Sequence, residues 1–131
     1  MAIANMKRAA LSATEREDFL RQQLLQTLTG RISEGELLRR LRKGILGLNQ
    51  SEFAKIAGIA RRSLSDLEND RGPATSATLN AAFGIFGIRL GLLPMNAELT
   101  KLLFSDFQAE EELPYQIRRF KEAKQGAVRA S

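Results

Sequence analysis

Cysteine, histidine and tryptophan are all missing from this chain of 131 residues. Without cysteine there is no disulfide and no thiolate metal ligand, and without histidine there is neither an imidazole ligand nor a histidine general base. Carboxylate chemistry remains, but no pair of acidic residues stands apart from the charged helix faces. We therefore expect no catalytic residues, no metal site and no cofactor.

A long apolar run is also missing. The longest apolar stretch is interrupted by Arg89 and falls short of the ~20 residues that a membrane span requires. Residues 1–10 contain Lys7 and Arg8 but not the continuous apolar segment of a secretory signal. No membrane helix and no export are expected, which makes the cytoplasm the expected location. The hydrophobic content of 44% is enough to fill the core of one ordinary domain.

Positive charge, in contrast, is in excess and unevenly placed. The formal net charge is +5 at pH 7, yet residues 39–62 alone hold seven basic side chains against the single acidic residue Glu52. The basic members are Arg39, Arg40, Arg42, Lys43, Lys55, Arg61 and Arg62. A concentrated basic segment favours a polyanionic partner such as nucleic acid.

Helix start signals recur along the first third of the chain. Thr14 with Glu17 has the spacing of a capping box, and leucines then recur every four residues until Gly30, which predicts a helix over about residues 15–29. We interpret this helix as an extra core or dimer-facing element in preference to a partner-binding appendage. Ser33 with Glu36 repeats the signal and predicts the first helix of the next domain.

The segment 49–69 has the pattern of two short helices that cross at a steep angle. Asn49 with Glu52 opens the first, over about residues 50–57, and Gly58 permits the left-handed turn that follows. The second, over about residues 61–69, follows Ala60, a poor cap. Its outward-facing side chains are Arg61, Arg62, Ser65 and Asp66. Because a helix fits the ~12 Å wide major groove, this pattern predicts sequence-selective binding to double-stranded DNA.

A further helix begins at Thr75 or Ser76, and its inward-facing residues are Leu79, Ala82, Phe83 and Phe86. The apolar residues Ile88, Leu90 and Leu92 then alternate with Arg89, Gly91 and Leu93. Such alternation is typical of a short strand. A lone strand leaves backbone groups unpaired, so we expect it to pair with its own copy in a homodimer; the alternative is an extended tail on the helical core.

Three parts are predicted in all. Residues 1–30 form an N-terminal extension with one helix, residues 31–93 form the DNA-binding domain with its dimerisation strand, and residues 94–131 form a helical extension with a disordered tail. In that last part, Leu99, Leu102, Leu103 and Phe107 suit one amphipathic helix. A second, basic helix around Tyr115 is expected after Pro114.

Residues 35–93 resemble the Cro/C1-type (XRE family) helix-turn-helix domain of bacterial and phage regulators. The resemblance rests on the sequence of residues 46–50, the spacing of Ala54 and Gly58, two leucines at positions 64 and 67, and Glu68-Asn69. It implies an all-α, lambda-repressor-like core of four to five helices. The residue pattern described above adds a short C-terminal β-strand pairing across a dimer and extra helices at both termini. The resemblance also implies a homodimeric transcriptional regulator, most often a repressor, on a palindromic operator.

The stretch 78–94 is also similar to HipB-like antitoxins, in which a short strand joins two subunits. This second resemblance implies an alternative function, in which the protein binds and neutralises a toxin kinase and represses its own operon. An RNA-associated or coactivator-like adaptor is a third, less favoured class, because the exposed side of residues 61–66 suits a groove and no aromatic platform for unstacked bases is visible. Two departures from the family pattern are Asp70, where Gly is common, and Ala74, where Pro is frequent.

The resemblance also assigns roles to single residues. It places base reading at Arg61, Arg62, Ser65 and Asp66, and phosphate contacts at Gln50, Asn69, Lys43, Arg42 and Ser51. Arg62 and Asp66 lie four residues apart, so the carboxylate is expected to hold the guanidinium in place for a guanine. Either Lys43 or Arg42 matches a position that pairs with Glu68, and a buried pair is the favoured role of Glu68.

Overall fold

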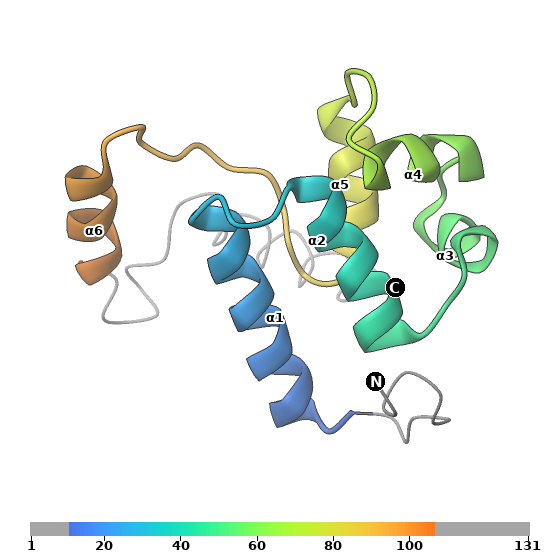
Figure 1. Cartoon of the computed structure of the whole chain (residues 1–131), viewed down its shortest axis with the longest axis horizontal. Helices are drawn as coiled ribbons and strands as arrows, with labels where there is room; N and C mark the ends of the chain where they lie inside the picture. Colours follow the sequence, from blue (N-terminus) through green and yellow to red (C-terminus); the bar gives the residue numbers. More distant parts are fainter. Residues whose placement is uncertain (1–10, 107–131) are drawn as a thin grey trace, which may run out of the picture. The chain divides into compact units, whose positions relative to one another are not determined.

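The computed structural model describes residues 11–106, and six α-helices lie in this range (Figure 1). They are α1 (Ala13–Leu28), α2 (Glu34–Leu41), α3 (Gln50–Ala57), α4 (Arg61–Glu68), α5 (Ser76–Gly84) and α6 (Ala97–Ser105), and a π-helical turn, η2 (Arg42–Leu46), continues α2. The described part of the chain is therefore all-α, as predicted. None of its helices has the length and apolar character needed to cross a bilayer.

The helix ends follow the capping chemistry of the sequence. The Ser33 side chain accepts a hydrogen bond from the Glu36 amide (3.1 Å) at the start of α2. A complete capping box joins Asn49 and Glu52 at the start of α3. Gly58 ends α3 in the left-handed region (φ 71°), where a side chain would be strained. The predicted bounds of α3 are thereby confirmed, and α4 begins at Arg61 without a side-chain cap, as expected from Ala60.

The predicted start of α1 is wrong by two residues. Its N-cap is Ser12, whose hydroxyl accepts a hydrogen bond from the Glu15 amide (3.1 Å). Thr14 lies inside the helix. Ser12 and Glu15 have the same three-residue spacing as Thr14 and Glu17, and the earlier cap is used because it lets the helix form additional backbone hydrogen bonds.

The hydrophobic core is formed mainly by α2, α3, α4 and α5. Its fully buried large side chains are Leu38, Leu41, Phe53 and Leu64. The rings of Phe53 and Phe86 stack with centroids 5.7 Å apart. Leu79 and Phe86 pack against this core, and Ala82 and Phe83 are buried in it, which confirms the predicted inward face of α5. In Figure 1, α1 packs along α2 on the side away from α3 and α4.

No strand forms among the described residues, so the strand predicted at Ile88, Leu90 and Leu92 is not present in them. Two backbone amides of this segment have acceptors within the same chain. The Leu90 amide donates to the Asn80 side-chain oxygen (2.9 Å), and the Ile88 amide donates to the Phe83 carbonyl (3.1 Å). A side-chain acceptor ten residues earlier thus replaces one of the acceptors that a partner strand would supply.

The chain divides into two compact units with the boundary between Leu90 and Gly91. In the second unit, α6 starts at the Asn96 side chain, which accepts from the amides of Glu98 and Leu99, and this confirms the predicted amphipathic helix. Phe107, the predicted basic helix around Tyr115 and the tail predicted after Gln125 lie outside the described residues, as does the segment before Leu11.

Candidate nucleic-acid interface

Helix α4 has one buried and one exposed side. Leu64 and Leu67 are buried on the inward side. Arg61 and Arg62 are exposed on the other side, and Ser65 and Asp66 are half-buried. The four side chains that the sequence assigns to base reading therefore all retain access to solvent. No ion pair joins Arg62 to Asp66 in the described part of the chain, so the guanidinium is not held by that carboxylate here.

A buried ionic network lies beneath this exposed side. Two guanidinium nitrogens of Arg42, Nε and Nη2, each donate to one carboxylate oxygen of Glu68 at 2.7 Å. The third nitrogen, Nη1, donates to the Leu48 carbonyl (2.8 Å). The two charged side chains are only 6% and 3% exposed. The predicted buried pair of Glu68 is thus confirmed with Arg42 as its partner, and it ties α4 to η2 and to the segment before α3.

The same network positions Gln50. Its side-chain Nε2 donates to Glu68 Oε1 (3.1 Å), so the first residue of α3 is held against the last residue of α4. Three hydrogen bonds therefore reach the buried carboxylate, two on Oε1 and one on Oε2, and such bonds offset the cost of burying its charge. All three guanidinium nitrogens of Arg42 thus donate to acceptors within the protein, so the guanidinium predicted to bind a phosphate is buried here.

The other predicted phosphate-binding residues lie at the surface. Lys43, Ser51 and Asn69 are exposed. The side-chain nitrogen Nδ2 of Asn69 donates to the Ser65 carbonyl (2.8 Å), which fixes the Asn69 side chain along the end of α4. Ser51 lies in the first turn of α3, where backbone N–H groups have no partner within the helix and the dipole is positive.

The turn after α4 is fixed by a contact that the sequence analysis did not identify. Asp70 has a left-handed backbone (φ 55°), which explains why glycine is common there in the family. Its carboxylate accepts from the Ser33 hydroxyl (2.6 Å) and from the Gly35 amide (3.0 Å). Asp70 therefore joins the end of α4 to the first turn of α2, where an acid is favoured by the helix dipole.

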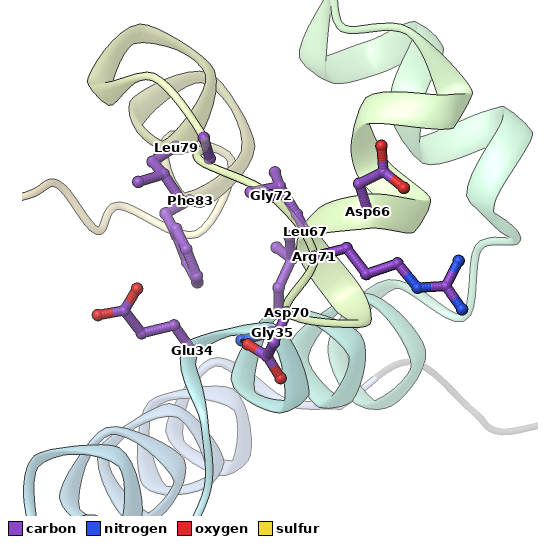
Figure 2. Close-up of a pocket in the computed structure, with 11 residues that line it drawn as sticks. Glu34, Gly35, Asp66, Leu67, Asp70, Arg71, Gly72, Leu79 and Phe83 are labelled. Atoms are coloured by element: carbon purple, nitrogen blue, oxygen red, sulfur yellow. Dashed lines mark hydrogen bonds between the residues drawn. The ribbon is translucent and has the colours of Figure 1, made fainter.

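A cavity of about 310 Å³ lies beside this turn. Figure 2 shows Leu79 and Phe83 on one side of it and Asp66 and Arg71 on the other. Asp70 and Gly35 lie between them. The described residues contain no group of three or more potential metal ligands, so this arrangement offers charged and apolar walls but no candidate metal centre.

Gly35 is the residue at which this junction is most tightly packed. A Cβ placed there would lie 2.3 Å from the Leu67 carbonyl oxygen and 2.6 Å from Asp70 Oδ1. We expect Gly35→Ala to reduce the free energy of unfolding by about 1–3 kcal/mol, because backbone must move to admit the methyl group. Urea denaturation of the purified protein measures this loss.

Gly84 provides the matched control for that substitution. It is also helical, but a Cβ placed there would meet no atom within 4 Å. Gly84→Ala is expected to leave stability unchanged or to raise it by up to about 1 kcal/mol, since alanine favours helix over glycine. Equal effects of the two substitutions would show that the contact between α2 and the turn after α4 does not constrain the fold.

Comparison with known proteins adds one finding. A helix-turn-helix family model matches residues 38–93, a segment that runs from α2 to the residues beyond α5. No curated protein and no solved structure matches the chain. This family model is a general helix-turn-helix model and gives no support to the HipB-like branch. The short strand that joins subunits in that branch is also absent from the described residues. The antitoxin interpretation is therefore not supported.

Proposed function

We propose that the protein is a transcriptional regulator of the Cro/C1 helix-turn-helix type, which recognises a specific sequence in double-stranded DNA through α4. The helix-turn-helix family model that matches residues 38–93 supports this proposal. The observation that carries the proposal is the composition of the exposed side of α4. Arg61 and Arg62 are exposed at its start, whereas Leu64 and Leu67 are buried on its other side. The helix is thus anchored in the core while two cations face outward.

In this proposal the exposed side chains of α4 read base edges in the major groove. Arg62 donates two hydrogen bonds to a guanine, and Asp66 accepts from the N4 amino group of a cytosine or orients Arg62 once DNA is bound. Arg61 and Ser65 lie at the edge of this surface. A carboxylate beside the phosphates would be repelled, so Asp66 favours a position over the bases rather than over the backbone.

Phosphate contacts are proposed at Gln50, Ser51, Asn69 and Lys43. Gln50 is supported by its place at the start of α3, where the helix dipole favours an anion. The burial of Arg42 leads us to propose for it an indirect role, in which its pair with Glu68 holds Gln50 in register with α4. These contacts set the orientation of the protein on DNA and carry no sequence information of their own.

We further propose that the protein binds as a homodimer on a palindromic operator and represses transcription. A recognition helix of eight residues contacts only a few base pairs, and helix-turn-helix proteins commonly double the site through a twofold axis. The half-sites would lie ~34 Å apart, one turn of B-DNA, or a multiple of that spacing. The segment 88–93, with its exposed Leu90, Leu92 and Leu93, is the proposed contact between the two copies.

Selection of bound sites from random duplexes tests the proposal directly. An enriched motif is expected, with two inverted half-sites at a spacing near one helical turn. A single unpaired motif would retain DNA recognition but reject the symmetric dimer. Binding without any enriched motif, or equal binding to single-stranded RNA at the same salt concentration, would contradict the proposed function.

Substitutions separate base reading from phosphate binding. Arg62→Ala is expected to cost about 1–3 kcal/mol on the selected site and to relax preference at one base pair, whereas Gln50→Ala should weaken binding to all sequences alike. Both variants are titrated against the selected and a scrambled duplex. If Arg62→Ala lowered affinity equally on both duplexes, Arg62 would be a phosphate contact.

A further inference from the structure

The turn that follows α4 holds an exposed cation in a fixed position. Asp70 is anchored through its carboxylate to Ser33 and Gly35. The Arg71 amide donates to the Asp66 carbonyl (2.8 Å), and the Asp70 amide donates to the Leu67 carbonyl (3.1 Å). The backbone of Arg71 is thereby tied both to the last turn of α4 and, through its neighbour, to the start of α2.

The hydrogen bonds that hold this turn among the described residues come from the backbone of Arg71 and from Asp70, and none comes from the Arg71 side chain. It is exposed, and among the described residues it forms no ion pair within 4.0 Å. In Figure 2 it extends away from Leu79 and Phe83, on the side where Asp66 lies. Neither the Asp66 nor the Glu34 carboxylate of the neighbouring cavity neutralises it. A positive charge is thus displayed beside the recognition helix with its backbone already ordered.

The length of α4, which separates Arg71 from Arg61 and Arg62, is close to the width of the DNA major groove. Arg61 and Arg62 begin the helix, and Arg71 follows its last residue, Glu68, by three positions. Eight helical residues extend about 12 Å, and the major groove is also about 12 Å wide. When the arginines at the start of α4 reach the bases, a cation beyond its end lies near a phosphate of the flanking backbone.

We propose that Arg71 binds a DNA phosphate and anchors the C-terminal end of α4 to the edge of the groove. This inference rests on the proposed function, since it requires α4 to enter duplex DNA. The entropy lost when Arg71 binds DNA is small, because the Asp70 contacts fix the backbone of this turn before binding. Only the side-chain rotamers of Arg71 then have to be restricted. The family pattern of phosphate-binding residues inferred from the sequence does not include this position.

The test is the salt dependence of DNA binding by Arg71→Gln. Each phosphate neutralised contributes about 0.9 to the slope of log K against log salt concentration. The variant is therefore expected to lower that slope by about 0.9 and to lose on the order of fivefold in affinity at 0.15 M salt. The loss should be the same on the selected and on a scrambled duplex, because phosphates are common to both. Affinities are measured by fluorescence anisotropy over a range of salt concentrations.

Arg16→Gln is the matched control, because it removes the same charge from an exposed position on α1. It is expected to leave the slope unchanged, since α1 packs mainly on α2, away from the proposed DNA-binding side of α4. If the slope for Arg71→Gln equalled that of this control, the inference would be overturned. A loss of DNA affinity confined to the selected duplex would also overturn it, because such a loss indicates base reading. A drop in unfolding free energy for Arg71→Gln without a change in slope would instead assign it to stabilising the turn.

Failure of this inference and failure of the proposed function give different results. If the unaltered protein shows no preference among duplexes, the proposed function fails. If Arg62→Ala weakens binding to the selected site while Arg71→Gln binds with the slope of the unaltered protein, only the role of Arg71 fails.

Discussion

Glu68→Ala is expected to lower the free energy of unfolding by about 3–5 kcal/mol, because it leaves the Arg42 guanidinium buried without a counter-charge. Both side chains are almost fully buried, and two hydrogen bonds of 2.7 Å join them. The substitution also removes the acceptor of Gln50. Thermal and urea denaturation measure the loss, which corresponds to a fall of the melting temperature by about 4–8 °C for each kcal/mol in a domain of this size.

A surface pair provides the control for this prediction. Arg40 Nε donates to Glu36 at 3.0 Å, but the two side chains are 39% and 38% exposed. Glu36→Ala should therefore cost less than about 1 kcal/mol, because water solvates the remaining guanidinium. Similar losses for Glu36→Ala and Glu68→Ala would mean that burial does not determine the strength of the Arg42–Glu68 pair.

A double substitution separates the stability of the pair from its role in DNA binding. Replacing both charges, as in Arg42→Met with Glu68→Leu, should recover most of the stability lost in Glu68→Ala, since no buried charge then lacks a partner. DNA affinity should remain reduced, because the Gln50 side chain is no longer held against the end of α4 by its hydrogen bond to Glu68. Full recovery of both stability and affinity would show that the network has no part in orienting Gln50.

Local signals allowed most of the helices to be predicted from sequence. The capping pair Asn49 and Glu52 and the left-handed turn at Gly58 each depend on groups within a few residues of one another. A cap or a turn of this kind forms in the same way in many contexts, so its residue pattern is informative alone. The exposed and buried sides of α4 followed from the same kind of local information, namely the helical period.

Contacts between distant residues could not be predicted in this way. Asp70 binds Ser33 across 37 positions, and no local pattern indicates which side chain lies opposite a helix start. The same limit explains the strand predicted at residues 88–92. Alternation of apolar residues is a local signal, whereas the Asn80 side chain that satisfies the Leu90 amide is brought there by the packing of α5.

The choice between Arg42 and Lys43 could have been made from the helical period. Arg42 lies four residues after the buried Leu38 and continues α2 in helical conformation, so it shares the inward face of Leu38, whereas Lys43 does not. Arg71 was not identified as a site residue for a different reason, because a turn has no repeating period that separates exposed from buried positions.

Phe53→Ala is the second substitution for which we expect a loss of about 3–5 kcal/mol in the free energy of unfolding. Phe53 is completely buried, and its ring stacks on that of Phe86 at a centroid distance of 5.7 Å. Truncation removes buried apolar surface, leaves a cavity between α3 and the end of α5, and ends an aromatic contact. Denaturation in urea measures the effect.

Two comparisons decide whether packing at Phe53 is the cause. Ile56 lies on the same helix but is 59% exposed, so Ile56→Ala should change stability by less than about 1 kcal/mol. Phe53→Leu should retain most of the stability, since leucine fills much of the space.

DNA affinity measured at low temperature, where Phe53→Ala remains folded, should stay within a few-fold of that of the unaltered protein, because Phe53 does not reach the surface. If Phe53→Ala lowered the free energy of unfolding by no more than Ile56→Ala does, a core centred on Phe53 would be contradicted. If the folded Phe53→Ala variant lost DNA affinity, the stack of Phe53 and Phe86 would also set the angle between α3 and α4.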